Sequence, residues 1–508
     1  MALTQHRALI VPNSERSREL RMPHARPLHR KFATHAHRTA CFVLSDEDRD
    51  AVAGGKDSDL AVGRLLINPL DFQCDSYGAV NGNHLKQDEI QRSWFWIPAL
   101  STFSFKEELV ILPANVSSKC FTWEGWGTSL CWWANFAGGL QSSDRDCILD
   151  LLFDLDKGLG MNIARYNIGG GANPELNERL RPFGCMPGFK PGPTVAYDWS
   201  ADSRQRTILL GARDRGATVF EAFSNSPPHW MTLSGSVTGN TRWGQDNLDP
   251  AYDVAFVDYL TEVVKHYQDQ WNLHFESIAP FNEPVEGWWN INKEKTTAQE
   301  GCNFSISSMR RVREASESVG KKIWMSEYGP LNWHGEDIDV ALGLGRHISL
   351  DLNELQASAW CYWQALEMPG SFWGLIQTSF TYDVEPKSLI ITKQYYVLMQ
   401  FTKWIRPGCH IFPVENFADS FLASADPAAK QVVLVFINAS TTFKHFGFDV
   451  SLLAPWFKTD DKLEATLFRT SALENHERLP SLIFTFPSIM ILVNSKSITT
   501  MVLSKLIS

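Results

Sequence analysis

Short apolar segments alternate with amphipathic helical patterns between residue 121 and about residue 404. One helical pattern places apolar side chains at i, i+3, i+4 and i+7 from Phe256 to Tyr267, and another runs from a capping Ser143 to Leu155. Six strand-like segments occupy residues 121–126, 162–168, 218–223, 277–282, 322–326 and 359–363. This alternation predicts βα units around a parallel sheet, which is an α/β fold.

The pattern differs on either side of this region. Residues 1–110 show no sustained periodicity, and we expect them to form a poorly patterned N-terminal extension. A helix predicted over residues 395–404 is followed by Pro407 and Gly408, after which β-like segments at 431–437, 463–468 and 482–486 are separated by polar turns. We therefore predict a (β/α) barrel over residues 111–405 and a small antiparallel β-sandwich over residues 406–508.

Composition excludes several classes of protein. With 44% hydrophobic and 20% charged residues, the 508-residue chain can bury a large core, which excludes wholesale disorder and fibrous repeats. Its net charge of −10 argues against nucleic acid as a partner. The segment 481–493 is too short for a transmembrane helix and is broken by Pro487, so no membrane partner is expected either.

Cysteines and the N-terminus bear on metals and compartment. The nine cysteines form no CxxC pair and no metal-ligand spacing with histidine, so no metal site is predicted. N-glycosylation sequons occur at Asn115, Asn303 and Asn438, but residues 1–40 contain no apolar stretch of the kind that a signal peptide has. The residues alone leave the localisation open.

The aromatic content is high, with 19 tryptophans and 12% aromatic residues. Flat rings stack well on the faces of sugar rings, whose C–H bonds are weakly positive. The alternative is that the tryptophans only pack in the core. The two possibilities are separated by whether tryptophans gather at particular strand ends.

Two glutamates lie at the carboxyl ends of predicted strands, where the catalytic groups of a barrel project. Glu283 follows the segment 279–282, and Glu327 follows the segment 323–326. Two carboxyl groups at one rim suit a retaining glycosidase, in which one donates a proton and the other attacks the anomeric carbon. Taken singly, each could equally be a capping or ion-paired carboxylate.

Other strand ends carry polar and aromatic residues as well. Arg165 is a charge within a predicted buried strand, which is unusual unless it pairs with a carboxylate. Asn225 and Trp230 follow the third strand, and Trp363 follows the last one. Trp126 lies in a segment dense in Trp and Gly. Trp126 and Trp230 could also be simple packing residues, and the neighbouring Glu124 is either a sugar contact or a member of a structural ion pair.

Together these segments resemble glycoside hydrolase family 30 of the retaining clan A, and most closely its fungal endo-β-1,6-galactanase-like branch. The resemblance spans about residues 121–450 and is most specific in the Glu-Gly-Trp-Gly-Thr-Ser-Leu-x-Trp-Trp-Ala string of residues 124–134. The Gln-Glu-Gly-Cys motif at 299–302 and the segment 394–408 also fit. The resemblance implies a (β/α)8 TIM-type barrel with a side β-sandwich, no cofactor or metal, and a secreted, monomeric enzyme that degrades a polysaccharide.

By the same resemblance, Glu283 is the general acid/base and Glu327 the nucleophile that cleave a β-1,6-linked galactan with retention. Asn282 hydrogen-bonds the 2-hydroxyl of the sugar, and Arg165 holds the nucleophile ionised. Trp363 forms the floor of the subsite where the bond breaks. The residues expected to line the cleft beside it are Trp126, Asn225 and Trp230.

One spacing departs from the family. The acid/base and the nucleophile end strands four and seven of this barrel, so about 90 residues should separate them, whereas Glu283 and Glu327 lie 44 residues apart. Strands five and six are therefore predicted to be missing, which would leave exposed strand edges at 277–282 and 322–326. Two alternatives stay open: an enzyme acting on another β-glycan, such as β-1,6-glucan or xylan, and an inactive carbohydrate-binding relic.

Overall fold

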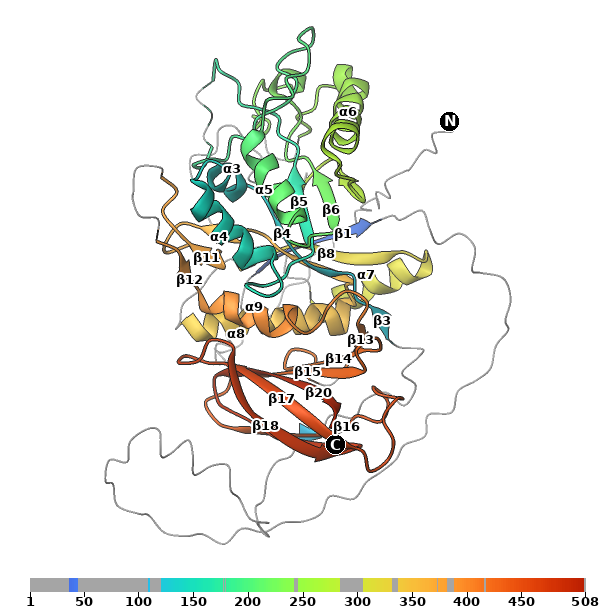
Figure 1. Ribbon diagram of the computed structural model, residues 1–508. Coiled ribbons are helices and arrows are strands. Elements are labelled where there is room, and N and C mark those ends of the chain that lie inside the picture. Colours follow the sequence, from blue (N-terminus) through green and yellow to red (C-terminus); the bar gives the residue numbers. More distant parts are fainter. Residues whose placement is uncertain are drawn as a thin grey trace, which may run out of the picture. The chain divides into compact units, whose positions relative to one another are not determined.

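The computed structural model describes residues 36–43, 108–109 and 120–506, apart from 177, 179, 242–244, 284–304, 331–336, 372, 382–387 and 415–416. For residues 36–43 and 108–109 it describes the backbone. A curled parallel sheet, an antiparallel sheet and the helices packed on them make up the described part of the chain (Figure 1).

The parallel sheet has the strand order β1-β8-β9-β4-β5-β6-β7. Its parallel strands are β4 (Gly125–Ser129), β5 (Ile163–Asn167), β6 (Val219–Phe223), β7 (Ser277–Ala279), β8 (Lys322–Pro330) and β9 (Ala359–Tyr362). Every residue of β4, β5 and β9 is buried, as expected for strands covered on both faces. Gly127 is needed in β4 because an added Cβ would lie 2.6 Å from Ile163 of the neighbouring strand.

Helices follow most of these strands. Their bounds are α3 (Trp133–Ala137), α4 (Ser142–Phe153), α5 (Ser203–Arg213), α6 (Asp253–Trp271), α7 (Ile306–Ser318), α8 (Asp337–Leu350) and α9 (Lys393–Thr402). The predicted stripe of α6 is confirmed, because Phe256, Tyr259 and Tyr267 are all buried while Val254 and Val257 face outward. The helix predicted to begin after a Ser143 cap instead includes that residue and begins at Ser142.

The second sheet has ten strands in the order β2-β16-β19-β18-β17-β20-β15-β14-β13-β3. Their bounds are β2 (Glu108–Leu109), β3 (Phe121–Thr122), β13 (His410–Phe412), β14 (Phe421–Asp426), β15 (Gln431–Asn438), β16 (Lys444–Asp449), β17 (Lys462–Thr470), β18 (Glu477–Thr485), β19 (Ser488–Val493) and β20 (Ser497–Lys505). All neighbours are antiparallel except β2 and β16. A small third sheet joins β10 (Leu366–Glu367), β11 (Ile376–Gln377) and β12 (Ile390–Ile391).

The ten-stranded sheet folds over its own core. Phe436 of β15 contacts Phe446 of β16 with ring centroids 5.2 Å apart, although four strands separate β15 from β16 in the sheet order. The turn between β18 and β19 pairs only Thr485 with Ser488, so the sheet can bend there. An antiparallel unit after the barrel is thus present as predicted. Its classification as a β-sandwich stays a prediction.

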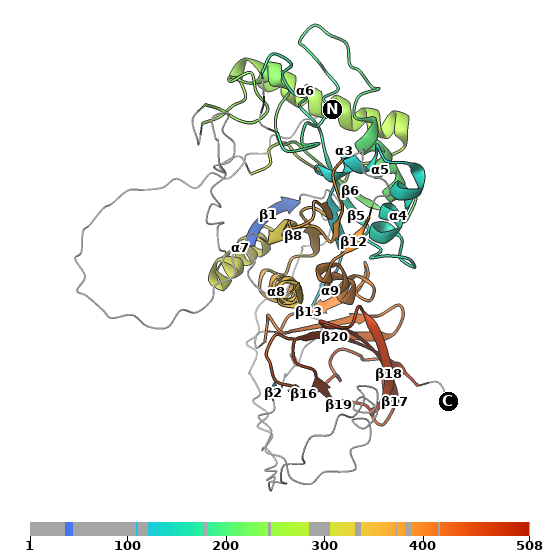
Figure 2. The ribbon, with the colours of Figure 1, turned by 90° about the vertical axis from the view of Figure 1, so that its left-hand side faces the viewer.

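Helices α8 and α9 lie between the two large sheets (Figures 1 and 2). On one side, Phe401 of α9 contacts Trp126 of β4, with ring centroids 6.0 Å apart. On the other side, Gly345 of α8 faces Ile437 of β15 and Ile498 of β20, and a Cβ on Gly345 would lie 3.4–3.5 Å from those two side chains. The close approach therefore suits a glycine on this helix.

Two expectations about the strands need correction. The segment 121–126 is not one strand, because β3 pairs with β13 of the antiparallel sheet and the first parallel strand begins only at Gly125. The predicted exposed edge at residues 322–326 is also wrong. There the backbone of β1 (Ala36–Val43) pairs antiparallel with β8, from Val43 opposite Lys322 to Ala36 opposite Pro330.

The strand count bears on the predicted loss of two barrel strands. Among the described residues, six parallel strands form the sheet, with β7 at its end, and between β7 and β8 the described residues include only α7. Residues 284–304 fall in that interval and lie outside the described residues. The absence of strands five and six therefore stays a prediction.

Deletion of residues 1–43 tests the role of β1. Because β1 supplies the hydrogen-bonding partner of β8, its removal should uncover a strand edge, lower the melting temperature and increase aggregation. Deletion of residues 1–34 is the matched control, since it leaves β1 in place. Differential scanning calorimetry and size-exclusion chromatography compare the two. Equal melting temperatures and equal monomer yields would show that β1 does not protect β8.

Candidate active site

The curvature of the parallel sheet brings Arg165 and Glu327 together. Arg165 lies on β5 and Glu327 on β8, with β9 and β4 between those strands in the sheet. Nevertheless, Nη1 of Arg165 donates a hydrogen bond of 2.9 Å to Oε2 of Glu327. Both side chains are buried, with exposed fractions of 0% and 10%. Strands three places apart can meet this way only on the concave face of a strongly curled sheet.

Arg165 contacts a second buried carboxylate. Its Nε donates to Oε1 of Glu221 at 3.3 Å, and its guanidinium lies 4.5 Å from the ring centre of Phe223. Glu221 stands beside Arg165 in the register of β5 and β6. The sequence analysis missed Glu221, although a charge inside an apolar strand, the same signal that singled out Arg165, was there to be used.

The pKa of Glu327 reflects this environment. Burial raises the pKa of Glu327 above its usual value, Arg165 opposes that rise by its charge and its hydrogen bond, and Glu221 adds to it. The ionised form of Glu327 therefore depends on the guanidinium beside it. A carboxylate nucleophile must be ionised to react, so a neighbouring cation of this kind suits it.

Asn282 and Glu283 follow the carboxyl end of β7. The backbone N–H of Asn282 donates to the carbonyl of Ser224 at 3.0 Å, which ties this turn to the end of β6. Asn282 is buried, whereas Glu283 is half-exposed. Glu283 has a φ of 45°, in the left-handed region that is uncommon for residues other than glycine. Such conformations concentrate at functional sites, which makes this turn a candidate.

Aromatic residues gather where the strands end. Cys131, Phe223 and Trp363 form a buried cluster, against which the half-buried Trp132 and Trp373 pack. Ala279 at the end of β7 also contacts this cluster. The ends of β4, β6, β7 and β9 thus converge on one place, as the sequence predicts, and Trp363 lies within it.

Asn225 reaches the same place. Its Nδ2 donates to Sγ of Cys131 at 3.2 Å, and Nδ2 of Asn167 donates to the same sulfur at 2.7 Å. Burial raises the pKa of the Cys131 thiol, so the sulfur is a neutral acceptor. Cys131 is a second residue that sequence reasoning did not single out.

Trp126 and Trp230 both take part in packing. Trp126 is fully buried, its Nε1 donates to the carbonyl of Ile405 at 2.7 Å, and its ring lies 4.4 Å from that of Trp123. The expectation that Trp126 lines the cleft is therefore wrong. Trp230 is half-buried, with its Nε1 donating to the carbonyl of Lys190 at 2.8 Å and its ring packed edge-on against Tyr252.

Glu124 is a member of a structural ion pair, which settles the alternative left open for it. Its Oε1 accepts from Lys322 at 2.9 Å, and its Oε2 accepts from Nε1 of Trp324 at 2.7 Å. Oγ of Ser358 also donates to Oε2, at 2.5 Å. These partners join the amino-terminal ends of β4, β8 and β9, the edge of the sheet opposite to the aromatic cluster.

The chain is similar to known glycoside hydrolases. The model of O-glycosyl hydrolase family 30 matches residues 106–337. An endo-β-1,6-galactanase of Hypocrea rufa is 28% identical over 426 residues, covering 67% of this chain and 84% of that protein. Both findings support glycoside hydrolase family 30 as the family of this chain. The chain is therefore an O-glycosyl hydrolase, as the resemblance in its sequence implies.

Two solved structures support the fold of this chain. A conserved exported protein from Bacteroides fragilis has a TM-score of 0.64 at 19% identity, covering 78% of this chain and 100% of that one. The catalytic domain of family 30 xylanase C from Talaromyces cellulolyticus has a TM-score of 0.54 at 16% identity, with the same two coverages. They support a barrel-like parallel unit followed by an antiparallel one.

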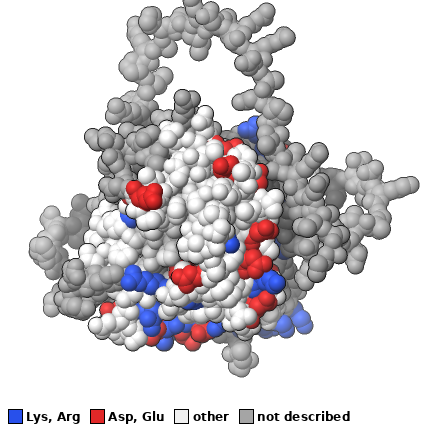
Figure 3. Space-filling view, turned by 90° about the horizontal axis from the view of Figure 1, so that it is seen from above, with Lys and Arg blue, Asp and Glu red and all other residues white. Residues whose placement is uncertain are grey.

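One face of the chain carries mixed charge. Seen from above, Asp, Glu, Lys and Arg form small separate patches with uncharged residues between them (Figure 3). This pattern suits a neutral ligand better than a highly charged polymer. Among the described helices, none combines the length and the apolar character needed to cross a bilayer.

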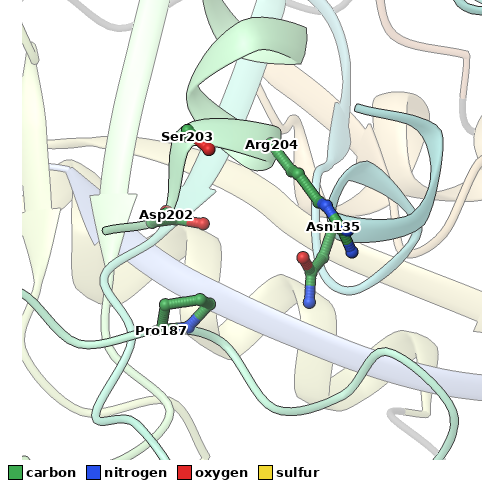
Figure 4. A pocket seen from close by; sticks show the side chains of 5 residues that line it. All are labelled: Asn135, Pro187, Asp202, Ser203 and Arg204. Atoms are coloured by element: carbon green, nitrogen blue, oxygen red, sulfur yellow. The ribbon is translucent and has the colours of Figure 1, made fainter. Parts of the chain in front are cut away.

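A hollow of about 170 Å³ lies beside the N-terminus of α5 (Figure 4). Its lining residues are Asn135, Pro187, Asp202, Ser203 and Arg204. None of the residues predicted for the active site lines it. Its notable member is Asp202, whose Oδ2 accepts from the hydroxyl of Tyr166 at 2.5 Å and from Nε2 of Gln205 at 2.7 Å.

The raised pKa of Asp202 predicts that the free energy of unfolding depends on pH. Burial raises its pKa from 3.8 to about 7, against the opposing hydrogen bonds from Tyr166 and Gln205. The folded state thus holds a proton that the unfolded state has released between about pH 4 and pH 7, so this group costs stability as the pH rises. The cost reaches the order of 4 kcal/mol above pH 7.

The variant Asp202→Asn removes this titration. The difference between the melting temperature of the variant and that of the parent should increase steadily from pH 4 to pH 7. The new contacts of the amide add only a constant to this difference. Calorimetry at several pH values measures the difference, and Asp258→Asn, at an exposed position on α6, is the matched control. A difference that stays constant across this range would contradict the raised pKa of Asp202.

Proposed function

We propose that this chain is a retaining endo-glycosidase that cleaves β-1,6-linked galactan by double displacement with Glu327 and Glu283. The observation that carries the proposal is the buried pair of Arg165 and Glu327 on the concave face of the curled sheet. The substrate class is supported by the likeness to the Hypocrea rufa endo-β-1,6-galactanase. The aromatic cluster around Trp363 supports a sugar ligand.

In the first step, an oxygen of Glu327 attacks the anomeric carbon and forms a glycosyl-enzyme bond. Glu283 gives its proton to the glycosidic oxygen, which leaves with the rest of the chain. In the second step, Glu283 takes a proton from water as the water attacks the anomeric carbon and releases Glu327. Two inversions give net retention. The mechanism requires the two carboxyl groups to lie about 5–5.5 Å apart across the bond.

Arg165 prepares the nucleophile for this step. Because burial raises the pKa of Glu327, the carboxylate would be protonated more readily without the guanidinium. The hydrogen bond from Nη1 also leaves Oε1 of Glu327 as the oxygen available for attack. Arg165 thus both stabilises the charge and selects the reacting atom.

Four of the remaining predicted residues bind the sugar. Asn282 hydrogen-bonds the 2-hydroxyl of the unit that reacts, an interaction that strengthens in the transition state. Trp363 forms the floor under that unit, and Asn225 donates from one side. Trp230, whose indole is partly used in packing, contributes at the rim. Trp126 has no part in the cleft.

The proposal includes the broader expectations drawn from the family. The reaction uses only carboxyl groups and water, so the enzyme needs no metal or cofactor. It acts as a monomer outside the cell, and its partner is a polysaccharide or oligosaccharide. Likeness to a galactanase and to an exported protein supports these expectations.

A second candidate is a carbohydrate-binding relic without turnover. The observation that favours it is the parallel sheet itself, which among the described residues has six parallel strands and an antiparallel β1 beside β8. A sheet of this kind binds sugar through the same aromatic residues. It differs from the enzyme only in turnover, so activity measurements separate the two candidates.

Glu327→Gln tests the nucleophile. The amide keeps the shape and the contact with Arg165 but cannot attack, so release of reducing ends from β-1,6-galactan should fall at least 1000-fold. Glu262→Gln, at an exposed position on α6, is the matched control and should retain full activity. Comparable activity of Glu327→Gln would remove the nucleophile assignment. A parent protein that binds galactan but never hydrolyses it would establish the relic.

Glu283→Ala tests the acid/base through the leaving group. Loss of the proton donor should reduce hydrolysis of galactan by at least 100-fold, because a sugar alkoxide leaves poorly. A β-galactoside with an acidic phenol as leaving group needs no proton, so its glycosylation step should be nearly unchanged. Steady-state and burst kinetics on both substrates measure the split. Equal losses on the two substrates would contradict an acid/base role.

A further inference from the structure

Trp132 forms a corner with Trp363. It follows Cys131 at the end of β4, it is half-buried, and its ring lies 5.3 Å from that of Trp363 at an interplanar angle of 87°. Two indoles set at right angles give a floor and a wall. Trp363 has a role in the proposed mechanism, whereas Trp132 has none so far.

The backbone of Trp132 is tied to the segment that carries Trp363. The N–H of Trp132 donates to Oε1 of Gln364 at 3.1 Å, and Gln364 is fully buried. The Nε2 of Gln364 in turn donates to Oε2 of Glu367. The wall and the floor are therefore fixed to one stretch of chain just after β9.

The ring of Trp132 is held as well. The guanidinium of Arg181 lies 5.0 Å from the centre of this ring. Its Nη2 donates to Oε1 of Glu367 at 2.6 Å and to Oε2 at 2.8 Å. Glu367 is 1% exposed and also accepts from the N–H of Met368 at 2.9 Å. A cation on an indole face restricts the ring, and the buried carboxylate fixes the cation.

The buried ion pair of Arg181 and Glu367 is not explained by stability alone. Burying Glu367 and most of Arg181 removes two charges from water, and such pairs add little net stability. What they supply is a fixed geometry. Here the fixed group is a partly exposed indole beside the proposed reacting subsite, and an indole held in one orientation stacks on a sugar without a further loss of rotamer freedom.

We propose that Trp132 is the wall of a second sugar subsite, which binds the neutral hexose unit next to the one above Trp363. Arg181 is a positioning residue that holds this wall through Glu367. The inference rests on the proposed glycosidase function and deepens it by making chain length a determinant of affinity. A substrate with one more unit gains a stacking contact at Trp132, while the chemistry at Glu327 stays unchanged.

Binding measurements test this inference without turnover. In the Glu327→Gln background, calorimetry measures the affinities of β-1,6-galacto-oligosaccharides of two to six units. Adding Trp132→Ala should weaken binding of the longer oligosaccharides about tenfold and flatten the dependence on length. Trp132→Phe should restore part of the difference.

Arg181→Met tests the positioning role. This variant should weaken the binding of the longer oligosaccharides several-fold, and Arg181→Lys should have an intermediate effect. In the active enzyme, Arg181→Met should raise KM while kcat changes less than twofold. Arg346→Met is the matched control, because it breaks an ion pair with Asp419 on α8 and the loop before β14. Equal effects of Arg181→Met on all lengths would show a merely structural arginine.

The outcomes separate the inference from the proposed function. If the parent binds galacto-oligosaccharides and folded Trp132→Ala binds every length equally well, the second subsite is wrong and the galactanase proposal stands. If the parent binds β-1,6-gluco- or xylo-oligosaccharides instead, the galactan proposal fails and a tenfold loss in Trp132→Ala on those ligands supports the subsite. If none of the three series binds the parent, both proposals fall.

Discussion

The buried guanidinium of Arg165 constrains the rest of the structure. A fully buried arginine requires carboxylates within hydrogen-bond distance, and Arg165 has Glu221 on the neighbouring strand and Glu327 three strands away in the sheet. The sheet must therefore curl until β5 and β8 face each other. Removing the guanidinium would leave two buried carboxylates without their counter-charge, at a cost of about 3–5 kcal/mol. The curvature of the fold and the ionisation of the proposed nucleophile thus depend on the same contact.

The two ends of the parallel strands have different roles: the amino-terminal ends carry structural contacts, and the carboxyl ends carry the proposed active site. At the amino-terminal ends, Glu124 joins β4, β8 and β9 through Lys322 and Trp324. Behind the sheet, Trp126 anchors β4 to α9 and to the carbonyl of Ile405. These structural contacts lie away from the carboxyl ends of the strands. The carboxyl ends carry the aromatic cluster and the polar side chains, and a glycosidase of this fold has its active site there.

The sequence predicts the strands and the pairing of Arg165 better than it predicts which side a residue faces. Arg165 was recognisable because a charge in a buried strand needs a partner, and the same logic applied to Glu221 would have found the third member. Trp126 was misplaced because β4 is buried on both faces, so no alternation of apolar and polar residues reveals which face meets the cleft. The partner of β8 lay in a segment without periodicity, because pairing through the backbone needs no side-chain pattern.

A covalent trap at Glu327 tests the central claim most directly. A 2-deoxy-2-fluoro-β-galactosyl or galactobiosyl donor with an activated leaving group slows both steps, so that the glycosyl-enzyme accumulates. We expect a single added glycosyl group, located by peptide mass spectrometry on Glu327 and formed more slowly in Arg165→Met. Labelling of another carboxylate, or no labelling in a preparation that hydrolyses β-1,6-galactan, would contradict the role of Glu327 as the nucleophile.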